Sequence, residues 1–141
     1  MSMVDMAAAP IVAIFASDRG PGDPDRASIM SQTGTYFAKR GARIVCLAES
    51  GVIPVPLITA ARAAGGQVQI VADTSIVLPP ALAGVEMEVL AMREERLERL
   101  AQVAQAYVAL PGSLASASAL FGSLAAAQVP NSADEIGRAH V

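Results

Sequence analysis

The chain has few of the residues that build disulfide-stabilised or histidine-based sites. Its 141 residues include one cysteine, one histidine and no tryptophan, and aromatic residues make up 4%. A single cysteine excludes a disulfide framework and predicts a reducing compartment. Cys46 lies within an apolar run, which predicts a buried structural thiol, and His140 stands next to the last residue. We therefore expect no metal site and no cofactor.

A strong charge of one sign is also missing. The net charge is -3, and the basic residues form no stripe that could neutralise a phosphodiester backbone. The apolar run Ala7 to Ala16 is too short to span a bilayer, and Asp5 replaces the basic flank of a signal peptide. We therefore expect a cytoplasmic protein with neither nucleic-acid nor membrane partners.

Aliphatic residues are abundant, since 53% of the chain is hydrophobic. Short β-branched runs alternate with helical patterns, which is typical of βαβ units around a buried parallel sheet. We expect an α/β fold, a Rossmann-like three-layer sandwich with a mostly parallel sheet of about five strands. The expected strands are Ile11 to Ala16, Ala42 to Ala48, Gln67 to Ala72, a weaker one at Glu86 to Leu90, and Tyr107 to Leu110.

Three helices are expected between these strands. The first begins with Asp23 and Pro24 and ends at Gly41, the second covers Pro56 to Ala64, and the third covers Arg93 to Ala106. Apolar residues recur at helical spacing on one face of the first and third helices. For the first helix these residues are Ile29, Met30, Thr33 and Phe37, and for the third they are Leu97, Leu100, Val103 and Ala104.

In such sheets a ligand binds at the carboxyl ends of the strands, where helix N-termini present free N–H groups. The loops to consider are therefore Ser17 to Asp23, Glu49 to Val55 and Pro111 to Ser116.

Three segments, together covering much of Ile11 to Gln128, resemble the LOG or "lysine decarboxylase-like" family of cytokinin riboside 5'-monophosphate phosphoribohydrolases. They are ASDRGPGDPDRASIMSQTGTYFAKRGARIVCLAESG, ITAARAAGGQVQIV and MREERLERLAQVAQAYVALPGS. The resemblance implies a nucleotide or phosphate ligand and a homodimer. It implies ligand contacts from Gly51, Pro111, Gly112, Ser113 and Ser116, and it makes Arg96 the counterpart of the family's catalytic arginine. Ser17, at the end of the first strand, is a further candidate contact to a nucleotide ribose or base.

The family's functional motifs are degenerate in this chain. The motif Pro-Gly-Gly-x-Gly-Thr-x-x-Glu falls on residues 111–119, so that Ser116 replaces the threonine and Ala119 replaces the catalytic glutamate. The glycine-rich loop after the second strand is replaced by side chains, and Glu49 would repel a phosphate. Hydrolysis of an N-glycosidic bond needs a carboxylate near the anomeric carbon, and no Asp or Glu occurs between Glu98 and Asp134.

Structural roles are the alternatives for these residues. Arg96 is equally compatible with a solvated helix position paired with a neighbouring glutamate, Ser113 and Ser116 with helix caps, and Ser17 with a solvated turn.

Several functions remain open. The main interpretation is a catalytically silent LOG-like protein that binds a nucleotide or phosphate. The alternatives are an active nucleoside 5'-monophosphate phosphoribohydrolase, a binding or interaction scaffold like the molybdenum cofactor carriers of the same superfamily, and a truncated gene without function.

The last seven residues, EIGRAHV, match what a common sequencing adapter encodes in one reading frame. We expect residues 135–141 to be a non-native tail and residues 1–134 to form one truncated domain. Such a tail would be exposed, and the sheet would end on an uncovered strand.

Overall fold

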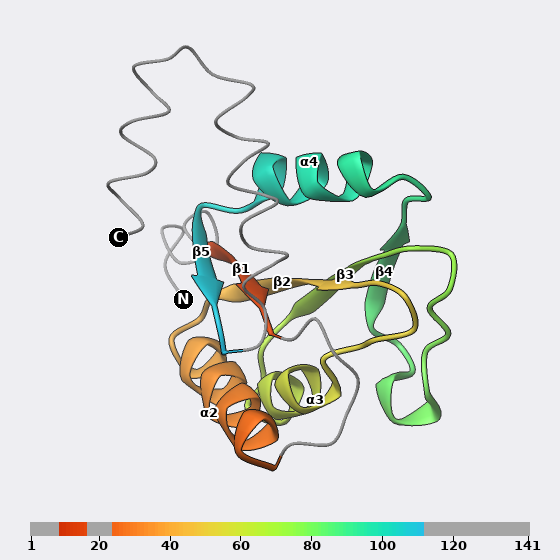
Figure 1. The fold of residues 1–141 in the computed structure, drawn as a ribbon. Coiled ribbons are helices and arrows are strands. Elements are labelled where there is room, and N and C mark those ends of the chain that lie inside the picture. The colour runs from red at the N-terminus through yellow and green to blue at the C-terminus, as the bar shows by residue number, and fades with distance from the viewer. Residues whose placement is uncertain (1–8, 17–23, 112–141) are drawn as a thin grey trace.

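The computed structural model describes residues 9–16 and 24–111, which form one parallel five-stranded sheet (Figure 1). The strand order is β4-β3-β2-β1-β5, and all four pairings are parallel. The strands are β1 (Ile11–Phe15), β2 (Arg43–Ala48), β3 (Val68–Ala72), β4 (Glu86–Val89) and β5 (Ala106–Ala109). The predicted α/β, Rossmann-like fold is confirmed, with β4 and β5 at the edges of the described sheet.

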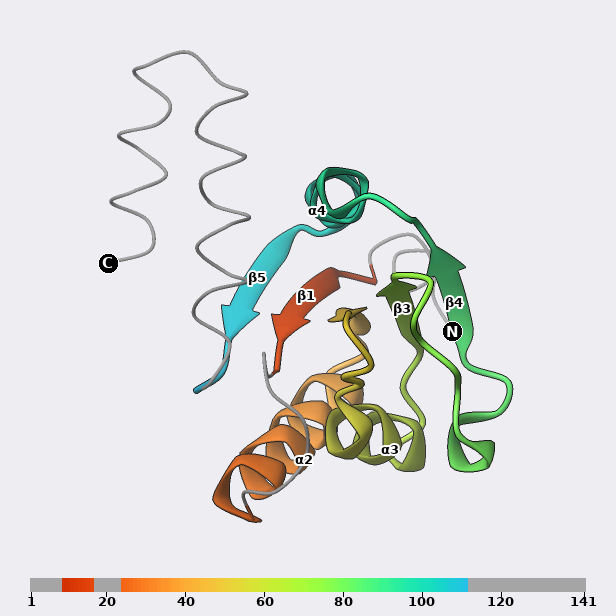
Figure 2. The same cartoon turned by 45° about the vertical axis from the view of Figure 1, so that its right-hand side comes forward.

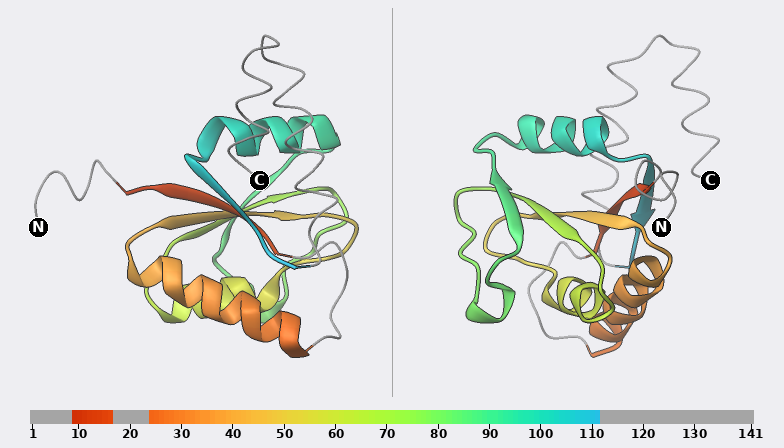
Figure 3. Two further views of the ribbon diagram at one scale, coloured as in Figure 1. Left: turned by 60° about the vertical axis from the view of Figure 1, so that its left-hand side comes forward. Right: turned by 180° about the vertical axis from the view of Figure 1, so that it is seen from behind.

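Helices cover both faces of the sheet and make the three layers. Helices α2 (Pro24–Lys39) and α3 (Val55–Ala63) pack on one face, and α4 (Arg93–Val103) lies across the other (Figures 2 and 3). A short 3₁₀ helix, η1 (Pro80–Leu82), precedes β4. None of the described helices is long and apolar enough to cross a membrane.

Alternation along the strands divides the core between the two faces, as the twofold periodicity of a strand requires. Ile14, Cys46 and Ile70 are buried on the side of α2 and α3. Val45 and Val71 are buried on the other side, together with residues of α4. Strands buried on both faces explain the nearly continuous apolar runs in the sequence.

The buried face of α2 differs from the predicted one. Met30, Gly34 and Ala38 are buried, whereas Ile29 is 36% exposed. A Cβ atom on Gly34 would lie 2.4 Å from the carbonyl oxygen of Leu57, so the backbones of α2 and α3 are in close contact there. The helix therefore packs through small residues four positions apart, and hydrophobicity alone did not identify that face.

Two helix ends show how well sequence signals predict boundaries. Gly41 has φ +77°, the left-handed conformation that glycine favours at a helix C-terminus, as predicted. Helix α4 ends at Val103, before the predicted Ala106. The chain has to leave the helix there because the N–H of Gln105 donates to the carbonyl of Ile11, 2.8 Å away, as β5 joins β1.

Cys46 provides a direct test of this core. It is 1% exposed, and burial raises the pKa of its thiol from 9.0 to about 12. Because the thiolate is the reactive form, we expect iodoacetamide at pH 8 to label the folded protein about 10³-fold more slowly than the protein in denaturant. Timed mass spectrometry measures both rates. Equal rates would show that the sheet is open at Cys46.

Candidate functional site

The strand order places the expected ligand crevice between β1 and β5. β2, β3 and β4 lie on one side of β1 and β5 lies on the other, so the order reverses at β1. In open α/β sheets ligands bind outside the carboxyl ends of the strands at such a reversal. The N–H of Leu110 donates to the carbonyl of Phe15 at this end, 2.8 Å away, and Pro111 follows as an exposed residue.

Most of the residues assigned to this crevice by sequence lie outside the described part of the chain. Ser17, Gly112, Ser113, Ser116, Ala119 and the tail at 135–141 lie outside the described residues. Pro111, Gly51 and Arg96 are described. Pro111 lies at the crevice, whereas Gly51 and Arg96 belong to a neighbouring polar cluster at the same carboxyl edge.

Arg96 forms the centre of that cluster. Two nitrogens of its guanidinium contact the same carboxylate oxygen of Glu49. Nη2 lies 2.6 Å and Nε 2.8 Å from Oε2. Its Nη1 donates to the carbonyls of Leu90 and Ala91 at 2.8 and 3.0 Å. Arg96 is thus fixed by contacts with both the end of β2 and the segment before α4.

The alternative of a solvated Arg96 paired with a neighbouring glutamate is wrong. Arg96 is only 6% exposed, and the partner Glu49 is 47 residues away in the chain. The carboxyl end of β2 lies beside the first turns of α4, which brings the two side chains together. The neighbouring Arg93 also approaches Glu49, at 3.9 Å, but its side chain is 49% exposed.

Glu49 is therefore a paired carboxylate. We expected its charge to repel a phosphate in the loop after β2, but Arg96 balances that charge. The same pairing occupies the guanidinium, because two of its nitrogens contact Glu49 and the third contacts two carbonyls.

The loop after β2 is a tight turn closed by the Val52 N–H donating to the carbonyl of Glu49 at 2.9 Å, and its other N–H groups bind the protein's own side chains. Ser50 and Gly51 both have left-handed backbones, with φ 52° and 77°. The N–H of Ser50 donates to Oδ2 of Asp73 at 2.8 Å, and the N–H of Gly51 donates to Oγ of Ser75 at 2.8 Å. Successive N–H groups in such a turn can bind an anion, and here Asp73 supplies the anion.

Sequence reasoning did not identify Asp73 or Ser75. Asp73 directly follows β3 and also accepts hydrogen bonds from the backbone N–H and the hydroxyl of Ser75. An acidic residue at the carboxyl end of a predicted strand was the available signal, because such ends meet at one edge of a parallel sheet.

These contacts predict an acid-dependent contribution to stability. The hydroxyl of Ser75, and then the N–H of Ser50, hold the pKa of Asp73 below its ordinary value of 3.8. A lowered pKa stabilises the fold above pH 3.8, and this contribution is lost as the pH falls through the folded-state value. We expect the stability difference between the wild type and Asp73→Asn to be constant above about pH 5 and to shrink below 3.8.

Urea unfolding at pH 3 to 7 measures that difference, with Glu94→Gln, an exposed change at the start of α4, as the control. If the Asp73→Asn difference were the same at every pH, the hydrogen bonds to Asp73 would contribute nothing in solution.

Within the described residues, no group of three or more His, Cys, Asp or Glu side chains is placed to hold a metal ion.

Comparison with known proteins identifies the fold. No protein-family model and no curated protein sequence matches the chain. Among solved structures it is similar to the molybdenum cofactor carrier protein MCP from Chlamydomonas reinhardtii, with a TM-score of 0.61 and 19% identity, over 82% of this chain and 72% of that chain. At this identity the similarity establishes a shared Rossmann-like fold, and the LOG resemblance stays a prediction.

Proposed function

We propose that the chain binds a nucleotide or another small phosphorylated molecule without cleaving it. The observation that supports this most strongly is the state of the two carboxylates that follow β2 and β3. Glu49 is paired with Arg96, and Asp73 accepts hydrogen bonds from Ser50 and Ser75. Because both carboxylates already have partners within the fold, neither is free to act as a general base.

The resemblance to LOG enzymes supports the same conclusion. Cleavage of an N-glycosidic bond builds positive charge on the ribose, and a carboxylate has to stabilise it. The motif places Ala119 at the position of that carboxylate, and the sequence has no Asp or Glu between Glu98 and Asp134 that could replace it. Arg96 corresponds to the family's arginine, but its guanidinium is occupied by Glu49.

The contacts of the loop after β2 favour one position for the ligand. Its Ser50 and Gly51 N–H groups already have acceptors, so a phosphate there would have to displace Asp73 and Ser75. We therefore place the phosphate at the ends of β1 and β5. The motif assigns Pro111, Gly112, Ser113 and Ser116 to this position, and Ser17 follows the first strand in the sequence. Gly51 then acts in the turn rather than as a ligand contact.

A cofactor carrier is the second candidate. The fold is similar to a protein described as a molybdenum cofactor carrier. A carrier binds and releases its cargo intact, so it needs an anion-binding crevice and no catalytic carboxylate. In this case the ligand would be a phosphorylated pterin and not a nucleoside monophosphate.

A thermal-shift screen with AMP and a pterin phosphate distinguishes these two candidates. A ligand at 100 times its Kd adds about 2.7 kcal/mol to the free energy of unfolding, which is a clear rise in Tm. We expect a rise with at least one of the two compounds. A rise with neither would contradict the proposed function.

Chromatographic assay of adenine tests catalysis separately. We expect no release from AMP above background, either by the wild type or by Ala119→Glu, because the crowded loop after β2 is unchanged in the variant. Release at about 10⁻² s⁻¹, 10³-fold below a typical enzyme, would show an active hydrolase. The homodimer and the cytoplasmic location stay predictions, and size-exclusion chromatography tests the first.

A further inference from the structure

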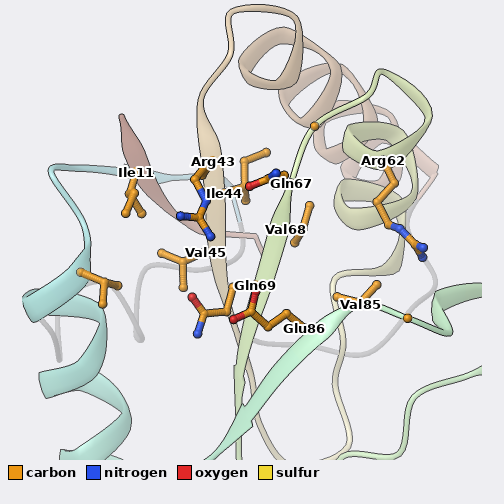
Figure 4. Close-up of a pocket in the computed structure, with 13 residues that line it drawn as sticks. Ile11, Arg43, Ile44, Val45, Arg62, Gln67, Val68, Gln69, Val85 and Glu86 are labelled. Carbon is orange, nitrogen blue, oxygen red and sulfur yellow. The ribbon is translucent and has the colours of Figure 1, made fainter. Parts of the chain in front are cut away.

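The amino edge of the sheet, opposite the expected crevice, borders a second candidate site. A cavity of about 490 Å³ opens there at the starts of β2, β3 and β4 (Figure 4). Its volume lies within the range of small-molecule sites, about 300 to 1,000 Å³. Its lining includes six apolar residues: Ile11, Ile44, Val45, Val68, Val85 and Val103.

Three polar side chains cross this cavity in a row. Gln69 of β3 is in register with Val45 of β2 on one side and with Glu86 of β4 on the other. Arg43 lies two residues before Val45, so it shares the same face of the sheet. Arg43 and Glu86 are two strand spacings apart across the sheet, about 10 Å, and two residues apart along it, about 7 Å. The cationic side chain of Arg43 and the anionic side chain of Glu86 thus lie near the amide of Gln69 (Figure 4).

None of these three side chains has a partner among the described residues. No hydrogen bond or ion pair joins the side chains of Arg43, Gln69 or Glu86 to residues 9–16 or 24–111, although their backbones pair in the sheet. Other charged groups nearby are satisfied. Arg62, on the opposite wall, donates to the carbonyl of Ala83 at 3.2 Å, and Arg99 of α4 pairs with Glu88 at 2.8 Å.

Gln69 is the informative member of the row. It is the one polar residue of β3, and it lies half-buried within an otherwise apolar strand. Strands inside a parallel sheet are normally apolar throughout, and because no buried polar side-chain atom of the described residues lacks a partner, the unpaired amide of Gln69 must be accessible from the cavity. Gln69 therefore offers both a donor and an acceptor to a ligand in the cavity.

We propose that this cavity binds a small zwitterion, such as a free amino acid. The ligand carboxylate pairs with the guanidinium of Arg43, which suits planar carboxylates. The ligand ammonium pairs with the carboxylate of Glu86, and the amide of Gln69 can both donate and accept between them. The aliphatic part of the ligand packs on Ile11 and Val103, which line the cavity and are half-buried.

Titration of the ¹⁵N-labelled chain tests this proposal. The probes are L-alanine, L-leucine and 4-aminobutyrate, with acetate and ethylamine as compounds that carry only one charge. We expect saturable shifts of the amides at residues 43–45, 67–69 and 86 with at least one zwitterion, and at least tenfold weaker binding of acetate and ethylamine. Absence of saturation by all three zwitterions, or equal binding of acetate, would overturn the proposal.

Variants test the assignment of each residue. Arg43→Gln, Gln69→Leu and Glu86→Gln should each weaken binding at least tenfold, whereas the matched changes Arg93→Gln and Glu94→Gln at the other edge should have no effect. Gln69→Leu should also keep or raise Tm, because it replaces an amide that has no hydrogen-bond partner among the described residues by an apolar residue like the others of β3. A large fall in Tm would make Gln69 structural, and unchanged binding by Glu86→Gln would remove the ammonium site. Either result would overturn the proposal.

Discussion

Replacing Arg96 by leucine is expected to lower the free energy of unfolding by about 3 kcal/mol. The variant leaves the carboxylate of Glu49, which is 16% exposed, without its main partner. It also removes the donor to the carbonyls of Leu90 and Ala91. Loss of one partner of a buried ion pair is costly because the other charge stays desolvated. Urea unfolding at pH 7 measures the change.

Arg93→Leu is the matched control for this variant. Arg93 lies on the same helix and approaches the same oxygen of Glu49, but at 3.9 Å and with a 49% exposed side chain. Exposed pairs contribute about 0.2 to 1 kcal/mol, so we expect a much smaller loss. The double variant Glu49→Leu/Arg96→Leu should lose less than the sum of its single changes. Equal losses for Arg93→Leu and Arg96→Leu would contradict the buried pair.

Gly34→Ala is expected to destabilise the fold by about 2 kcal/mol, although alanine is the better helix former by about 1 kcal/mol. Its Cβ would lie 2.4 Å from the carbonyl oxygen of Leu57 and 3.2 Å from the backbone nitrogen of Ala61. Because both are backbone atoms, α2 and α3 would have to separate. Urea unfolding of the purified variant measures the loss.

Ser28→Ala, an exposed change on the same helix, provides the comparison and should stay within about 0.5 kcal/mol of the wild type. If Gly34→Ala instead stabilised the protein, helix propensity would dominate, and the two helices would not be in the close contact described above.

The central strands β1, β2 and β3 were predictable from the sequence because each is a short apolar run that the sheet buries on both faces, whereas the edge strands β4 and β5 are only half-buried. Their expected bounds differ from the observed ones by about one residue, as for Gln67 to Ala72 against Val68–Ala72. Helix ends were harder to predict. Ala104 and Ala106 continue the helical pattern of α4, and only the pairing of β5 with β1 shows where the helix ends.

The polar cluster at the carboxyl edge was less predictable. The Glu49–Arg96 pair joins residues 47 positions apart in the sequence. A pattern among neighbouring residues cannot indicate a contact over that separation. Sequence reasoning recognised Arg96 by resemblance and Glu49 as an obstacle to phosphate, but it treated them separately. The hydrogen bonds of Asp73 to the loop after β2 depend on the neighbouring positions of β2 and β3, which strand order alone determines.

A titration of the ¹⁵N-labelled protein with AMP tests the central claim, which is intact binding between β1 and β5. We predict saturable shifts at the amides of Ala16 and Leu110, no shift at Ser50 and Gly51, and unchanged AMP signals throughout. The Ser50 and Gly51 amides should not respond because Asp73 and Ser75 already accept their hydrogen bonds. Shifts confined to Ser50 and Gly51, or the appearance of free adenine, would contradict this account.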